Sequence, residues 1–219
     1  MSPTPIEDIA VCCLRAFTQL VPASRAVFYH VDQTLQARDF TLLGMSTAMH
    51  GDYLQHYHQF DPLQPRHCAS EKHPVVPLTL AMARQPLRNN RRYEAFLQQH
   101  GVIDVVEIFA HRAGQPTAAI SLLRDAESGR FTPDQLARLD ALQTLLQMAV
   151  AHTPPCVDRL SELTPRERQL ALLVRDGASN KELAQTLNVG LPTIKTHLIN
   201  LFRKTGVTRR TELVNRLFL

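Results

Sequence analysis

Residues 177–204 decide the fold of the C-terminal part of the chain, and they read Gly-Ala-Ser-Asn-Lys-Glu-Leu-Ala-Gln-Thr-Leu-Asn-Val-Gly-Leu-Pro-Thr-Ile-Lys-Thr-His-Leu-Ile-Asn-Leu-Phe-Arg-Lys. Apolar residues recur three and four positions apart on both sides of 188–190, which predicts helices over 180–187 and 191–204. The inward-facing positions are Leu183, Ala184, Leu187, Ile194, Leu198 and Leu201. Two helices joined by so short a connection form a helix-turn-helix.

Capping signals extend this prediction to the whole C-terminal part. Thr164 stands three residues before Glu167, and Ser179 stands three residues before Glu182. Each pair is a capping box, in which a hydroxyl and a carboxylate bind free amides at a helix start. No strand pattern follows residue 161, so 161–219 is predicted to be an all-α module. Its four predicted helices cover 165–175, 180–187, 191–204 and 209–218.

The charge of the chain is concentrated in this module. Residues 160–219 hold 10 Lys and Arg against 5 Asp and Glu, whereas residues 1–159 hold 14 against 15. A basic segment on a near-neutral body is typical of a nucleic-acid-binding protein. The second helix of a helix-turn-helix can enter the DNA major groove. We therefore expect double-stranded DNA as a partner.

Four short motifs in order carry a family resemblance. They are Leu163-Thr-Pro-Arg-Glu167, Gly177-Ala-Ser-Asn-Lys-Glu-Leu-Ala184, Thr193-Ile-Lys-Thr-His197 and Lys204-Thr-Gly-Val-Thr-Arg209. Together they resemble the LuxR/NarL-type DNA-binding domain. One departure is Gly190, where that family more often has a serine N-cap.

The resemblance implies roles for residues of the second and third helices of the module. Base-facing positions fall on Lys195, Thr196 and Ile199, and Asn200 lies on the same outward face. Positions near the phosphate backbone fall on Ser179, Asn180, Lys181, Thr193, His197, Arg203 and Lys204. The fourth helix, with Leu213, Val214 and Leu217, is where such domains usually dimerise.

A proline pair separates this module from the rest of the chain. Pro154 and Pro155 stop a helix, so 153–160 is predicted to be a linker between a domain over 1–152 and the module over 161–219. Apolar patterns upstream predict helices at 6–20, 48–58, 89–100 and 132–152, and strands at 25–31, 39–45, 102–110 and 116–124. Residues 60–90, which are rich in proline, are expected to be irregular. The predicted fold class is α+β, with helices packed on an antiparallel sheet.

The upstream domain carries a second resemblance. Tyr53-Leu-Gln-His-Tyr57, Asp61-Pro-Leu63 and His73-Pro-Val-Val-Pro77 resemble the autoinducer-binding domain of quorum-sensing LuxR-type receptors, a GAF/PAS-like α-β-α sandwich. In that family an Asp before a Pro binds the amide of the ligand, and a Tyr and two Trp line the pocket. The resemblance implies Tyr53, Tyr57 and Asp61 as ligand-binding residues.

The chain has no Trp, and Pro77 stands where that family has its second one. This departure argues against an acyl-homoserine lactone. Two alternatives stay open for the domain. It binds a different small-molecule effector, or it is a ligand-free surface for protein interaction and dimerisation. The long helix 132–152 carries an apolar stripe that packs on the sheet, mediates a homodimer, or does both. A two-fold symmetric dimer predicts an inverted-repeat operator.

Several other classes lack support in the sequence. Phosphotransfer would need an acidic pair after a first strand, but Glu7 and Asp8 begin a helix. No nucleophile elbow, phosphate loop or paired-carboxylate motif indicates an enzyme. Five histidines and Cys68 cluster within 50–73, but their spacing does not match a structural metal site, so no cofactor or metal is predicted. No apolar run spans a membrane, the N-terminus does not resemble a signal peptide, and the cysteines show no disulfide framework, so we expect a cytoplasmic protein.

Overall fold

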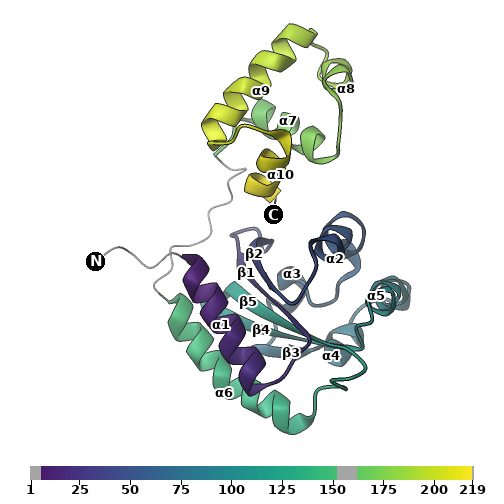
Figure 1. Cartoon of the computed structure of the whole chain (residues 1–219), viewed down its shortest axis with the longest axis vertical. Coiled ribbons are helices and arrows are strands. Elements are labelled where there is room, and N and C mark those ends of the chain that lie inside the picture. The colour runs from purple at the N-terminus through teal and green to yellow at the C-terminus, as the bar shows by residue number, and fades with distance from the viewer. Residues whose placement is uncertain (1–5, 152–161, 219) are drawn as a thin grey trace. The chain divides into compact units, whose positions relative to one another are not determined.

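The computed structural model describes residues 6–151 and 162–218. Contacts divide the chain into two compact units, 1–156 and 157–219, and the division falls within the stretch 152–161 that lies outside the described residues. The predicted linker and Cys156 belong to that stretch. Figure 1 shows the two units.

The first unit is built on one antiparallel sheet of five strands in the order β2-β1-β5-β4-β3. The strands are β1 Arg25–Val31, β2 Ala37–Leu43, β3 Val75–Pro77, β4 Asp104–Arg112 and β5 Gln115–Arg124. Two hairpins, β1–β2 and β4–β5, are joined through the central pairing of β1 with β5. Both predicted hairpins are confirmed.

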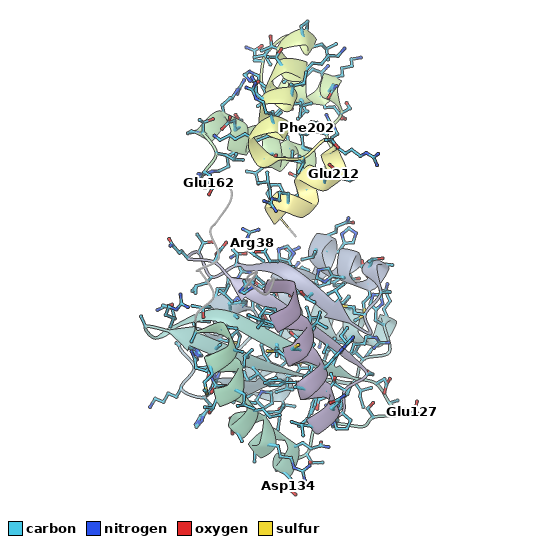
Figure 2. All side chains as sticks on the ribbon, turned by 60° about the vertical axis from the view of Figure 1, so that its left-hand side comes forward. Arg38, Glu127, Asp134, Glu162, Phe202 and Glu212 are labelled. Carbon is cyan, nitrogen blue, oxygen red and sulfur yellow. The ribbon has the colours of Figure 1, made fainter. Side chains whose placement is uncertain are left out.

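Helices cover both faces of this sheet, which confirms the predicted α+β class and the α-β-α layering (Figure 1). Helices α1 Ile6–Leu20 and α6 Pro133–Val150 pack side by side on one face. Thr132 caps α6, since its hydroxyl accepts from the amide of Gln135. The other face is covered by α2 Thr47–Asp52, α3 Pro65–Cys68, α4 Leu78–Met82 and α5 Leu87–Gln99. Side chains fill the space on both sides of the sheet (Figure 2).

Strand alternation sorts the sheet residues between the two faces. Phe28, Ile108 and Ile120 point into the core beneath α1 and α6. Val27, Phe109 and Leu123 point into the core beneath α2 to α5. A residue two positions from a core residue on the same strand shares its face. The face on which a residue lies therefore decides which polar side chains can meet.

The structure corrects the prediction for residues 60–90. They are not irregular, because α3, the edge strand β3 and α4 lie within them. Proline takes part in this order: Pro65 stands at the first position of α3, where a missing amide costs no hydrogen bond. Pro77 ends β3 at the edge of the sheet, a position that tolerates an absent ladder donor.

Several other boundaries also differ from the prediction. The helix expected over 48–58 is α2 followed by a π turn, Tyr53–Tyr57, and a 3₁₀ turn, His58–Phe60. The second strand begins at Ala37 rather than at residue 39. Asp32 explains the earlier start, because its Oδ1 accepts from the amides of Thr34 and Gln36 at 2.8 and 2.9 Å and closes the loop tightly.

The second unit consists of helices α7 Pro165–Arg175, α8 Asn180–Thr186, α9 Leu191–Thr205 and α10 Arg210–Phe218. Both predicted capping boxes form, at Thr164 with Glu167 and at Ser179 with Glu182. Gly206 ends α9 in the left-handed conformation, at φ 70°. The predicted inward residues of α8 and α9 lie in the core of the unit, where Leu183, Ile194 and Leu201 are fully buried.

Candidate DNA-binding surface and effector pocket

The exposed face of α9 is set by the residues that it buries. Because Ile194, Leu198 and Leu201 face the core, the positions between them point outward. Lys195, Thr196, Ile199 and Asn200 are all exposed, as are Thr193 and Arg203, whereas His197 is half-buried. The side chain of Ile199 is 64% exposed, so it is accessible to a partner.

The start of α8 is held by an internal network. The Ser179 hydroxyl accepts from the amide of Glu182, and the Glu182 carboxylate accepts from the amide of Ser179 at 2.7 Å. Asn180 Oδ1 accepts from Arg210 Nη2 at 2.5 Å, which ties α8 to α10. Lys181 is exposed beside them. This leaves Lys181 as an exposed cation at the positive end of the α8 dipole.

Two of the cations expected near phosphate have partners within the module. Lys204 Nζ lies 2.8 Å from Glu167 Oε2, so it bridges α9 to the cap of α7. Arg203 Nη2 donates to Asn200 Oδ1 at 3.3 Å along the same helix. Both cations are exposed, so either can exchange its partner for a phosphate at small cost.

Two of the three residues expected to mediate dimerisation through the fourth helix are buried in the core of the module. Leu213 and Leu217 are 0% and 4% exposed and pack in the core of the module, and Val214 is half-buried against it. Leu213 and Leu217 therefore stabilise the four-helix unit itself. In this structure those two side chains offer no surface to a second copy.

A cavity of about 100 Å³ lies in the first unit, between the sheet and the segments α2 to α5. Its wall is largely apolar and aromatic, with Val27, Tyr29, Leu35, Phe40, Met45, Met49, Tyr53, Leu63, Tyr93, Phe96, Val105 and Leu123 among the lining residues. Few polar groups reach it, and they include two carboxyl groups, those of Asp61 and Glu107. An apolar concavity with a few convergent polar groups is the usual form of a small-molecule site.

Asp61 is held at one side of the cavity by hydrogen bonds to both of its carboxylate oxygens. The Tyr53 hydroxyl donates to Oδ2 at 2.7 Å, and the amide of Leu63 donates to Oδ1 at 2.8 Å. Burial raises the pKa of Asp61, and these bonds together with one from Tyr93 oppose that rise. The π turn at 53–57 and the turn at Asp61 thus place a phenol and a carboxyl against each other.

Glu107 reaches the cavity from the sheet. It pairs with Ser121 across β4 and β5, and the Ser121 hydroxyl donates to Oε2 at 2.5 Å. Burial raises the pKa of Glu107 to about 8, and hydrogen bonding by Ser121 and Tyr29 only partly opposes this effect. The carboxyl is 2% exposed. No described residue donates a hydrogen bond to its Oε1.

Unpartnered polar atoms gather at this cavity. Among the described residues, five buried side-chain nitrogen or oxygen atoms lack a hydrogen-bond partner, and three of them belong to lining residues: His50 Nε2, Gln64 Nε2 and Glu107 Oε1. Burial lowers the pKa of His50 to about 4, so its ring is neutral at pH 7. Such atoms are rare in folded proteins, and a ligand or water that bonds them accounts for their retention.

The structure brings together some of the residues predicted from the sequence. Tyr53 and Asp61 meet at the cavity, whereas Tyr57 is absent from its lining and packs on Phe96, with ring centroids 5.1 Å apart. Glu107 was missed. The available signal was a carboxylate inside the apolar run 105–110, a position where a charged residue needs a partner.

The His, Cys, Asp and Glu side chains of the described ranges do not form a metal site. Over 6–151 and 162–218, no group of three or more His, Cys, Asp or Glu side chains is placed to hold a metal. Burial raises the pKa of Cys68 to about 12, so the thiol stays protonated at neutral pH. Within the same ranges, no helix is both long and apolar enough to cross a membrane.

A sheet domain with an effector-type cavity, followed by a helix-turn-helix module, defines a class of proteins, the one-chain transcription regulators. Residues 161–217 match the family described as bacterial regulatory proteins, luxR family. The chain is 36% identical over 214 residues to the monoamine regulon transcriptional regulator of Klebsiella aerogenes, and the match covers 97% of this chain and 92% of the relative. The chain therefore belongs to the LuxR family of transcriptional regulators.

One solved structure shares the fold of the first unit. The GAF domain/HD domain protein from Geobacter sulfurreducens is 14% identical and matches with a TM-score of 0.53 over 69% of this chain and 96% of its own. Escherichia coli SdiA matches over 100% of this chain and 94% of its own, with 14% identity and a TM-score of 0.47. The GAF-like character expected for the domain is confirmed.

Proposed function

We propose that this protein binds a specific DNA operator through the exposed face of α9, and that a small molecule in the first unit's cavity changes its affinity for that operator. The observation that carries the sensing role is the group of three unpartnered polar atoms in one apolar cavity. The observation that carries DNA binding is the exposed row on α9, which buried neighbours hold outward.

The proposed contacts follow the usual division between reading and positioning. Lys195 reads a guanine edge or a phosphate, and Thr196 and Ile199 contact base edges and thymine methyl groups. Residues placed to position the module on the backbone are Ser179, Asn180, Lys181, Thr193, His197, Asn200, Arg203 and Lys204. Since the partner is bacterial DNA, the protein acts in the cytoplasm.

The regulatory step is a shift between two states. An effector alters DNA binding only if it binds the two states with unequal affinity. The name of the Klebsiella relative describes control of a set of genes, and its match over nearly the whole chain supports the same role for this protein. We infer that the protein is not an enzyme.

We further propose that the active form is a homodimer on an inverted-repeat operator. Leu145 and Met148 of α6 are 58% and 66% exposed although they are large and apolar. They lie three residues apart on one helix, beside positions that α6 buries against the sheet. We call this exposed pair the α6 patch.

Native mass spectrometry of the protein purified from its own host tests the sensing role. The proposal expects a reproducible non-covalent adduct, and the effector recovered from it should change the affinity of the chain for a selected operator. A ligand-free protein whose operator affinity does not respond to host metabolite extracts would contradict sensing. It would instead support the alternative of a ligand-free interaction domain.

A further inference from the structure

We propose that the effector is a small primary amine, bound as its ammonium ion by Glu107 with its apolar body against the aromatic wall of the cavity. This inference deepens the proposed function and rests on it, because it names the chemical class of the sensed molecule.

Glu107 has the geometry of a carboxylate that can bind a cation. It lies mid-strand in β4, and its Oε2 already accepts from the Ser121 hydroxyl at 2.5 Å, which fixes the carboxyl in place. Its Oε1 is buried at the cavity and has no hydrogen-bond donor among the described residues. An ammonium group carries three donors and no acceptor, so it matches this orphaned acceptor.

Asp61 has a different part in the same site. Both of its oxygens accept hydrogen bonds within the protein, from Tyr53 and from the amide of Leu63. It therefore holds the Tyr53 ring in the cavity wall while adding negative potential. Charge repulsion by Asp61 raises the pKa of Glu107, and a cation between the two carboxyl groups relieves that repulsion.

The wall and the size of the cavity select the body of the ligand. The rings of Tyr29, Phe40, Tyr53, Tyr93 and Phe96 line it together with two methionines. Aromatic faces attract cations as well as hydrocarbon. About 100 Å³ is less than the roughly 150 Å³ of a cavity that accommodates benzene, so only a compact molecule fits. A short alkyl amine fits this limit better than a long acyl chain.

Binding of a cation should also release a proton. Glu107 is protonated in the empty pocket at neutral pH because burial raises its pKa, and an ammonium ion favours the ionised form. The groups that face it or act on it are Asp61, Tyr29 and Ser121, with Tyr53, Tyr93 and Cys68 nearby. Of these, only Asp61 and Glu107 carry an acidic group that can titrate below pH 8.

The experiment compares three probes of one shape on the full-length protein by isothermal titration calorimetry. The probes are isobutylamine, isobutanol and isobutyrate. We expect the amine to bind roughly 10- to 100-fold more tightly than the alcohol, and isobutyrate not to bind. Repeating the titration at pH 7 in buffers of different ionisation enthalpy should show release of about one proton per amine bound.

Two variants test whether Glu107 causes the preference for the amine and the release of the proton. Glu107→Gln keeps the shape and the Ser121 contact, and it should abolish both the preference for the amine and the proton release. Glu94→Gln removes an exposed carboxylate on α5 and should leave both unchanged. If Glu107→Gln does not fold, the wild-type preference and proton count still decide. Equal binding of amine and alcohol, or amine binding without proton release, overturns the proposal.

The outcomes separate this inference from the proposed function. If the alcohol or the carboxylate binds as well as the amine and shifts operator affinity, the cavity is a sensor but not a cation site. If no probe binds while a host metabolite of another class does, the amine assignment is overturned and sensing stands. If nothing binds, both proposals fail, and DNA binding is then judged by operator assays alone.

Discussion

Lys195 shows how a single exposed residue is placed for recognition. It follows Ile194, which is 0% exposed, so the helix turns its amine away from the core. Lys195→Ala should cost about 1–3 kcal/mol of operator binding and relax preference at one base pair. Fluorescence anisotropy with the selected operator and single-base variants of it measures both effects.

A matched change on another helix separates base reading from the loss of a charge. Arg216→Ala removes an exposed cation from α10 of the same module. It should lower affinity for all sequences slightly, through weaker long-range attraction, with the base preference intact. Unchanged preference in Lys195→Ala would remove that residue from the base-reading role.

Glu107 makes the first unit sensitive to pH at the same scale. Its folded pKa of about 8 lies above the usual value of 4.5, so its contribution to stability is present at low pH and is lost as pH rises through about 8. From pH 7 to 8 the free energy of unfolding should fall by about 1 kcal/mol, and Glu107→Gln should abolish that fall. His50, with a folded pKa of about 4, acts in the opposite sense at lower pH, below this window.

Urea unfolding followed by tyrosine fluorescence isolates this effect. All four tyrosines, Tyr29, Tyr53, Tyr57 and Tyr93, belong to the first unit, and the chain has no Trp. The signal therefore reports that unit while the helical module stays silent. Glu94→Gln should keep the wild-type slope. A slope in Glu107→Gln equal to that of the wild type would show that this carboxyl is ionised in the folded protein.

At the scale of the helix, Ser179 serves two functions that substitution can separate. Its hydroxyl caps α8 by accepting from the amide of Glu182. Ser179→Ala should therefore destabilise the module by about 1 kcal/mol. Ser179→Asp keeps a capping acceptor and should restore that stability, yet it should weaken DNA binding because it adds a negative charge near the expected phosphate.

Two independent readouts are needed for this pair of variants. Hydrogen exchange of α8 and α9 amides in the full-length protein reports local stability, and operator binding reports recognition. The proposal expects Ser179→Asp to match the wild type in the first and to fall below it in the second. Wild-type affinity in that variant would place Ser179 away from the DNA backbone.

The whole molecule is proposed to work as a dimer, and the α6 patch provides the test. Met148→Glu places a charge where Met148 is 66% exposed, so the monomer should keep its fold. We expect loss of the dimer in analytical ultracentrifugation. Affinity for an inverted repeat should fall by roughly 100-fold, because the second half-site then no longer binds intramolecularly.

Leu87→Glu is the matched control for this prediction. Leu87 begins α5 and is 74% exposed, so the change has the same chemistry on a different surface. It should leave both the oligomeric state and the affinity as in the wild type. A dimer that survives Met148→Glu would show that another surface joins the two copies.

Features that depend on neighbours within about four residues could be predicted from the sequence. The capping pairs at Thr164 and Ser179, the left-handed glycine Gly206 and the outward row on α9 all follow from helix geometry alone. The two β-hairpins were likewise predicted, because the strands of each hairpin adjoin in the chain. These features arise from interactions that close short loops.

The edge strand β3 and the residues that meet in the cavity depend instead on tertiary packing. β3 is three residues long and exists because it pairs with β4, 29 to 33 positions along the chain. Asp61 and Tyr53 were expected, but the meeting of Glu107 with Ser121 requires the register of β4 with β5. A one-residue slip in that register would send the carboxyl to the opposite face of the sheet. Such pairing depends on how the whole core packs, which no local pattern in the chain specifies.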